Sequence, residues 1–309
     1  MTPQVFDSLM RRYVARTPQM QATGMQVTDV QPQRGTMTAP ARPEWVGEPA
    51  RGWLHPGAVT VLADSACGLA VGTTLTERTP YATLDLRMDY LRPARVGHPL
   101  VCEAHAFRRT RSVVFVRAEV WQDDRQAPVA AAQASFMLGT PAGNRRPPGE
   151  AVAPAPAPAA DEPPRWAPPA ASEPVALDVP YIQGLGIREV ADPDAPLYHL
   201  PFAPPLIGNP YLPALHGGVV AGFAESAALL HLWRTLKGTR LPMSIDFSVD
   251  YVRAARPEDC WASCEAVRVG ARVALVQVRV WQRRTEQPVV VARGHFLLTA
   301  AEAEAAAPA

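Results

Sequence analysis

An internal repeat constrains this chain more than any other feature of its sequence. LHPGAVTVLADSACGL, at 54–69, aligns with LHGGVVAGFAESAALL, at 215–230. TLDLRMDYLRPAR, at 83–95, aligns with SIDFSVDYVRAAR, at 244–256, with the same offset of 161 residues. A repeat this long predicts two copies of one fold. Two copies in one chain can form a pseudo-dimer, in which a pseudo-two-fold axis replaces the true axis of a homodimer; further homo-oligomers stay open.

A proline-rich segment separates the two copies. Eleven prolines lie between Gly139 and Val175. Because proline disfavours both helix interiors and sheet ladders, we expect an extended linker there. The predicted organisation is an N-terminal domain at 1–140, a Pro/Ala-rich linker at 141–175, a C-terminal domain at 176–300 and a disordered Ala-rich tail at 301–309.

Each copy repeats the same order of predicted elements. An extended segment comes first, at about 21–39 and at about 181–202. The long apolar stretch follows and predicts a helix that is apolar on every side, which indicates burial. Four strand-like runs complete the copy; TLDLRMDYL, for example, alternates apolar and polar residues. Because the connections are short, the predicted fold is α+β, with each copy an antiparallel sheet of about five strands wrapped around one long central helix.

Composition excludes several classes of protein. Lys and Arg number 30 against 29 Asp and Glu, a formal net charge of +1, which argues against a nucleic-acid partner. The cysteines show no CxxC spacing, so we expect free thiols in a reducing compartment and no metal site. The N-terminal residues lack the apolar core of a signal peptide, and no uninterrupted apolar run approaches the roughly 20 residues of a membrane span. We therefore expect a cytoplasmic protein with no membrane partner.

One carboxylate interrupts each apolar helix. Asp64 and Glu225 occupy equivalent positions, each nine residues after a histidine, His55 or His216. An unpaired buried carboxylate is costly, or its pKa rises until it is neutral. In a structural interpretation, a buried arginine or backbone amides satisfy the acid. An acid at both equivalent positions favours a functional interpretation.

Glycines at the helix starts supply a second component. Gly57 follows His55 in HPG, and Gly218 follows His216 in HGG. First-turn N–H groups have no intrahelical partner, and with the helix dipole they form a positive site for an oxyanion or a polarised carbonyl. A helix cap without further function is the alternative, and a direct catalytic part for the histidines is left open.

The acid and the amide of one helix lie too far apart to act together. Gly218 and Glu225 are seven residues apart, roughly 10 Å along an α-helix. Two helices running antiparallel across a two-fold axis would instead bring each acid to the N-terminus of the other helix. We therefore expect two composite sites, Gly57 with Glu225 and Gly218 with Asp64.

These motifs resemble those of a known family. HGGVVAGFAESAALL is similar to the HGG-x6-(D/E) signature of hotdog-fold acyl-CoA thioesterases of the PaaI-like and 4-hydroxybenzoyl-CoA types. DYLRPA and DYVRAA resemble the strand that follows the helix in that family. The resemblance covers roughly 27–138 and 181–298. It implies tandem hotdog domains that hydrolyse an acyl-CoA thioester without metal or cofactor.

The resemblance also implies roles for individual residues. Glu225 and Asp64 become the general base or nucleophile, while Gly218 and Gly57 donate an amide to the thioester carbonyl. His216 and His55 complete the predicted catalytic set.

Other residues depart from the family pattern or are weaker candidates. Pro56 removes one N–H from the first copy, although proline is tolerated in a first helical turn. Asn209 lies seven residues before the second histidine, whereas the family places an Asn six before it. Trp53 is a candidate for lining an acyl pocket, and Arg92 and Arg253 are candidates for binding CoA phosphates. Both arginines could instead end a solvated strand.

Two other functions remain as alternatives. One is a non-catalytic acyl-CoA-binding or regulatory hotdog protein, which the acids at both positions argue against. The other is a hotdog dehydratase or hydratase. The spacing between histidine and acid in those enzymes differs from the spacing in this chain.

Overall fold

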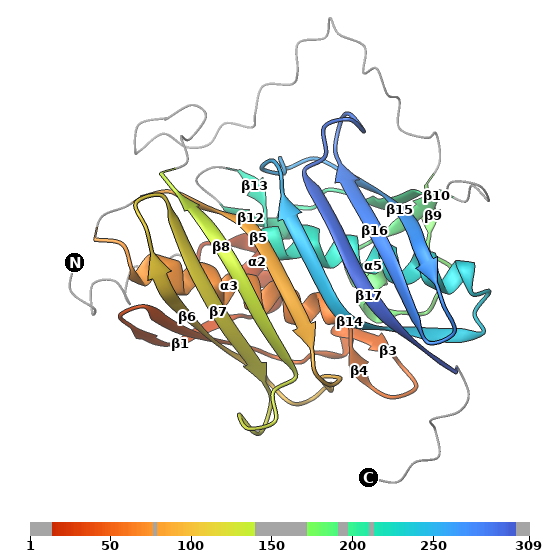
Figure 1. The fold of residues 1–309 in the computed structure, drawn as a ribbon, viewed down its shortest axis with the longest axis horizontal. Coiled ribbons are helices and arrows are strands. Elements are labelled where there is room, and N and C mark those ends of the chain that lie inside the picture. Colours follow the sequence, from red (N-terminus) through yellow and green to blue (C-terminus); the bar gives the residue numbers. More distant parts are fainter. Residues whose placement is uncertain (1–13, 77–78, 140–171, 191–196, 210–212, 301–309) are drawn as a thin grey trace, which may run out of the picture.

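One antiparallel sheet runs through both copies of the repeat. The computed structural model describes residues 14–76, 79–139, 172–190, 197–209 and 213–300. In these residues, 13 strands follow the order β1-β2-β6-β7-β8-β5-β14-β17-β16-β15-β11-β10-β9 (Figure 1). The first copy contributes β1 (Gln26–Gln31), β2 (Arg34–Ala39), β5 (Tyr81–Tyr90), β6 (Leu100–Arg109), β7 (Val113–Trp121) and β8 (Ala130–Leu138). The second contributes β10 (Arg188–Val190), β11 (Leu197–Leu200), β14 (Arg240–Tyr251), β15 (Cys260–Val269), β16 (Val273–Trp281) and β17 (Val290–Ala300), and β9 (Glu173–Pro174) completes its edge.

Two long helices lie against one face of this sheet. They are α3 (Pro56–Thr73) and α5 (Gly217–Thr235), and Figure 1 shows both behind the strands. Short elements precede each of them. In the first copy these are α2 (Pro18–Thr23), the 3-10 turn η1 (Pro43–Trp45), and the paired strands β3 (Val46–Glu48) and β4 (Trp53–Leu54). In the second they are α4 (Pro180–Gly184), η2 (Pro204–Leu206), and the paired strands β12 (Ile207–Asn209) and β13 (Ala214–Leu215).

The two halves of the sheet join through equivalent strands. β5 pairs with β14, and Arg87 lies opposite Ser248, which is its own equivalent in the repeat. A residue that faces its equivalent marks a two-fold axis, so the junction is the isologous interface of a pseudo-dimer. Arg87 donates hydrogen bonds to Asp89 at 2.7 Å and to Asp246 of the other copy at 3.5 Å, so it bridges two carboxylates that face each other across the junction.

The apolar helices are buried as predicted. In α3, Leu62, Ala63 and Ala66 have no exposed surface, and in α5 the same holds for Phe223 and Ala224. The strands alternate buried and exposed residues, which places their apolar face on the helices. No helix among the described residues is long and apolar enough to cross a membrane.

The segments before the long helices differ from the prediction. Each was expected to be extended, but each forms a short helix and then a hairpin, β1–β2 or β10–β11. The turn between β1 and β2 is Pro32–Gln33, and Gln33 has a φ of 64°. Glycine or asparagine usually fills such positions, so the sequence carries no recognisable turn signal there.

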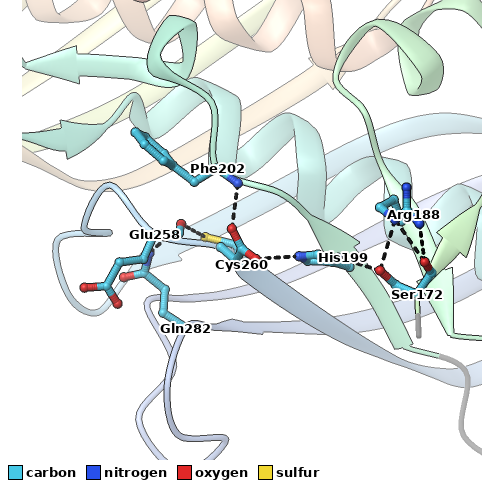
Figure 2. A network of polar contacts seen from close by, with 8 residues as sticks. Ser172, Arg188, His199, Phe202, Glu258, Cys260 and Gln282 are labelled. Atoms are coloured by element: carbon cyan, nitrogen blue, oxygen red, sulfur yellow. Dashed lines mark hydrogen bonds and ion pairs between the residues drawn. The ribbon is translucent and has the colours of Figure 1, made fainter. Parts of the chain in front are cut away.

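The edge of the second half is fastened by a polar cluster. Ser172 Oγ lies 2.8 Å from His199 Nδ1, and His199 Nε2 lies 3.0 Å from Asp259 Oδ2. Arg188 donates to both the carbonyl and the hydroxyl of Ser172 (Figure 2). His199 also stacks on Trp261, with ring centroids 4.1 Å apart. Ser172 directly precedes β9 and Arg188 lies in β10, so their hydrogen bonds hold the start of β9 against the sheet.

Part of the predicted linker and tail lies outside the described residues, namely 141–171 and 301–309. The last residues of the predicted linker are described, and there Glu173 and Pro174 form β9 beside β10. The described part of the second half therefore includes residues 172–175, which were predicted as the end of the linker.

Candidate active site

Both histidines cap the start of a long helix. The amide of Gly57 donates to His55 Nδ1 at 3.0 Å, and the amide of Gly218 donates to His216 Nδ1 at 3.1 Å. Burial lowers the pKa of His55 to about 3. It also lowers the pKa of His216, although Asp64 opposes part of that effect. Both imidazoles are therefore neutral near pH 7, with Nδ1 as an acceptor and the proton on Nε2.

The second ring nitrogen of each histidine faces a serine of the opposing helix. His216 Nε2 lies 3.0 Å from Ser65 Oγ, and His55 Nε2 lies 3.5 Å from Ser226 Oγ. Each hydroxyl donates in turn to a carbonyl of its own helix. Neither serine was predicted as a site residue, although one follows the acid directly in each copy.

The two helices run antiparallel and touch through glycine. A Cβ atom on Gly57 would lie 3.0 Å from the Cα of Gly222, and one on Gly218 would lie 2.7 Å from the Cα of Val61. Later positions in α3 therefore meet earlier positions in α5. The helices need glycine at these contacts because any larger residue would push them apart. This register places each acid at the level of the other helix's first turn.

Asp64 lies directly on the N-terminus of α5. The Gly218 amide donates to Asp64 Oδ2 at 2.7 Å, and the Thr83 hydroxyl donates to Oδ1 at 3.1 Å. His216 Nδ1 lies 3.6 Å from the same carboxylate, whose side chain is 6% exposed. The structure thus brings together four groups from three elements: an acid from α3, an amide and a histidine from α5 and its cap, and a hydroxyl from β5.

Glu225 has a different set of partners. The Tyr90 hydroxyl donates to Glu225 Oε2 at 2.8 Å and lies 2.7 Å from Thr60 Oγ1. Oε1 has no hydrogen-bond partner, and the residue is 0% exposed. The Gly57 amide donates to His55 and no hydrogen bond joins it to Glu225, so the second predicted pair is not a mirror of the first.

Burial changes the acidity of Glu225. It raises the pKa of this carboxyl to about 7, and the hydroxyls of Ser244, Tyr90 and Thr60 offset part of the effect. Ser244 occupies the position equivalent to Thr83, but its hydroxyl makes no hydrogen bond of normal geometry. Glu225 is therefore substantially protonated near neutral pH.

Two strand tyrosines belong to these centres and were missed as site residues. Tyr90 and Tyr251 are equivalent positions of the duplicated DY motif. Tyr90 binds Glu225, whereas the buried hydroxyl of Tyr251 has no partner. Tyr251 lies at the Asp64 centre, because a Cβ on Gly217 would lie 3.3 Å from its ring and 3.0 Å from Asp64 Oδ2. The sequence could have indicated both tyrosines, because each directly follows an aspartate at equivalent positions of the repeat.

The remaining predicted residues lie around the centres. Trp53 is half-buried in β4, with the Arg51 guanidinium 5.0 Å from its ring centroid. Asn209 pairs with Ala214 in the small sheet before His216. Arg92 and Arg253 are bonded to backbone carbonyls of hairpin loops, Ala127 and Pro288 respectively. Among the described contacts of Trp53, Arg92 and Arg253, no hydrogen bond or ion pair joins them to either acid.

The fold and the paired centres define a tandem hotdog protein. Comparison with known proteins agrees, because the model of the thioesterase superfamily matches residues 51–129 and 212–289, roughly half of the chain. The chain belongs to the thioesterase superfamily. The predicted family and the predicted fold class are both confirmed.

The chain is also similar to individual known proteins. It is 30% identical over 140 residues to the medium/long-chain acyl-CoA thioesterase YigI of Escherichia coli strain K12, an alignment covering 41% of this chain and 89% of that protein. A putative thioesterase from Novosphingobium aromaticivorans has a TM-score of 0.61 at 20% identity, covering 88% of this chain and 98% of that one. A hot dog fold protein from Alicyclobacillus acidocaldarius has a TM-score of 0.62 at 15% identity, covering 89% and 96%. Both likenesses are long enough to extend over both copies of the repeat in this chain.

Proposed function

We propose that this protein is an acyl-CoA thioesterase and that the centre formed by Asp64 and Gly218 carries the reaction. The observation that supports it best is the 2.7 Å contact between the Asp64 carboxylate and the Gly218 amide, which come from two antiparallel helices. A thioester carbon placed between them has a base or nucleophile on one side and an amide donor for its oxygen on the other. The medium/long-chain activity of the Escherichia coli relative makes such acyl-CoAs the first substrates to test.

The reaction follows from these groups. The thioester oxygen takes over the Gly218 N–H, so the helix N-terminus stabilises the negative charge that develops on it. Asp64, as general base, accepts a proton from water, whose oxygen adds to the carbonyl carbon. The carbon–sulfur bond then breaks, which gives a fatty acid and CoA, and the proton passes to the thiolate. Asp64 acting as nucleophile would form an acyl anhydride first, and water would hydrolyse it to the same products.

His216 and Thr83 hold this centre in place. The neutral imidazole accepts from the Gly218 amide through Nδ1, and Ser65 fixes its other nitrogen. Thr83 holds the second oxygen of Asp64, which leaves the carboxylate in one orientation. Preorganisation of this kind keeps the acid and the amide in position before the substrate arrives.

The test is hydrolysis of saturated acyl-CoAs of increasing length, followed by detection of the free thiol. Asp64→Asn keeps the shape of the side chain but removes the base, and kcat is expected to fall by about 10²- to 10⁴-fold. Asp29→Asn, an exposed change in β1, is the matched control and should hydrolyse at the wild-type rate. A folded Asp64→Asn variant with wild-type kcat would contradict the proposal.

A further inference from the structure

The two centres differ in the residue that covers the start of the long helix. PQMQATGM at 18–25 aligns with PYIQGLGI at 180–187, so Gln19 and Tyr181 are equivalent. Both are buried, at 2% and 5% exposure. Helix α4 packs against η1 and β3, which precede His55, while α2 packs against η2 and β12, which precede His216. Each short helix therefore packs against the segment that leads to the capping histidine of the other copy.

Tyr181 fills the space at the Glu225 centre. Its ring stacks on His55, with centroids 4.2 Å apart and planes inclined by 8°. Its hydroxyl lies where two glycines leave room: a Cβ on either Gly57 or Gly222 would come within 2.7 Å of it. A substrate carbonyl approaching the first turn of α3 would meet this phenol.

The Glu225 centre also has fewer donors for a thioester oxygen. Pro56 has no N–H, and the space beside Gly57 is filled by the Tyr181 hydroxyl. The acid itself is fully buried, with one oxygen held by Tyr90. A carboxyl with a pKa near 7 suits a general base, but the Tyr181 hydroxyl fills the space that a substrate carbonyl would need beside Gly57 and Gly222.

The Asp64 centre has the opposite character. Both residues after His216 are glycines with an N–H, and the Gly218 amide points at the acid. Gln19 stands at the position equivalent to Tyr181, and neither its amide oxygen nor its amide nitrogen has a hydrogen-bond partner, as is also true of the Tyr181 hydroxyl. A buried amide with both atoms unpaired is costly in a folded protein unless water or a ligand binds it.

We infer that Gln19 and Tyr181 decide which centre admits acyl-CoA: the Asp64 centre is open and its substrate contacts the Gln19 amide, while Tyr181 closes the Glu225 centre. This inference rests on the proposed function for the identity of the ligand. The chain then binds one acyl-CoA, although it contains two copies of the fold.

Binding stoichiometry tests the inference independently of hydrolysis. The probe is a dodecanoyl-CoA analogue in which CH₂ replaces the thioester sulfur, titrated calorimetrically into the full chain. Wild type is expected to bind one equivalent per chain. Tyr181→Gln copies the residue of the open centre and is expected to bind two. Gln19→Tyr copies the closed centre and is expected to bind none.

Circular dichroism and urea unfolding verify that each variant folds before it is titrated. Two equivalents bound by wild type, or one by a folded Tyr181→Gln, would overturn the inference. If Gln19→Tyr does not fold, Gln19→Leu replaces it, and an affinity for the analogue at least tenfold weaker than that of wild type is expected. Unchanged affinity would overturn the assignment of Gln19. A wild type that binds one equivalent but hydrolyses no acyl-CoA would contradict the proposed function while supporting this inference.

Discussion

The buried carboxyl of Glu225 makes stability depend on pH in a direction opposite to that of most acids. Its pKa rises from the ordinary 4.5 to about 7 because the folded protein removes it from water. In the unfolded chain the carboxyl has its ordinary pKa. Unfolding between pH 4.5 and about 7 therefore releases a proton from Glu225, and the ionisation favours the unfolded state. Its contribution to stability is greatest below pH 4.5 and is lost progressively as the pH rises through 7.

The size of the effect follows from the two pKa values. Each pH unit between them corresponds to about 1.4 kcal/mol. The rise from 4.5 to about 7 therefore corresponds to about 3 kcal/mol. Glu225→Gln has the same shape and no charge at any pH. Its amide oxygen can accept from Tyr90, and its NH₂ group can reach the unpartnered Ser244 hydroxyl.

The assay is urea unfolding of wild type and Glu225→Gln from pH 4.5 to pH 8.5. The stability of the variant relative to wild type should increase by about 3 kcal/mol across this range, with most of the change between pH 5 and 7.5. Glu119→Gln, at an exposed position of β7, is the control and should show a difference that does not vary with pH. A relative stability of Glu225→Gln that stays constant or decreases as the pH rises would refute the reasoning.

Two further predictions concern the helix contacts. Ser65→Ala leaves the buried Nε2–H of the capping histidine without its 3.0 Å partner and should cost about 1–3 kcal/mol in urea unfolding. Ser226→Ala removes the 3.5 Å contact and should cost less; equal losses would contradict the difference between the two caps. Gly57→Ala forces a Cβ to within 3.0 Å of the opposing helix backbone and should lower stability by about 1–3 kcal/mol. Gly68→Ala, in the same helix, places its Cβ 3.9 Å from the Tyr81 ring and should raise stability by about 0.5–1 kcal/mol. A thermal melt that ranks the two alanines the other way would refute the packing argument.

The architecture could be predicted from the sequence because two independent signals agreed. Apolar periodicity separates a buried helix from half-exposed strands, and the repeat requires that both copies fold alike. The β1–β2 hairpin was missed because Gln33 has a positive φ, at a turn position that glycine or asparagine usually fills. The short helices before each hairpin were missed because six residues, as in α2, are too few to show a period.

The candidate site was only partly accessible to sequence reasoning. Asp64 and Glu225 stand out as charges in apolar helices, and helix length alone implies that each must act with the opposite helix. Nothing in one dimension shows that Tyr181 stacks on His55, since α4 and α3 are more than a hundred residues apart in the chain. The unequal surroundings of the two acids, and therefore the different partners of the two centres, appear only when the copies pack together.

The most direct measurement is a crystal structure of the protein with the dodecanoyl-CoA analogue that carries CH₂ in place of sulfur. We expect its ketone oxygen within hydrogen-bond distance of the Gly218 amide and its carbonyl carbon beside the Asp64 carboxylate. A ketone bound away from both groups, with the Asp64–Gly218 contact unbroken, would contradict the proposed mechanism.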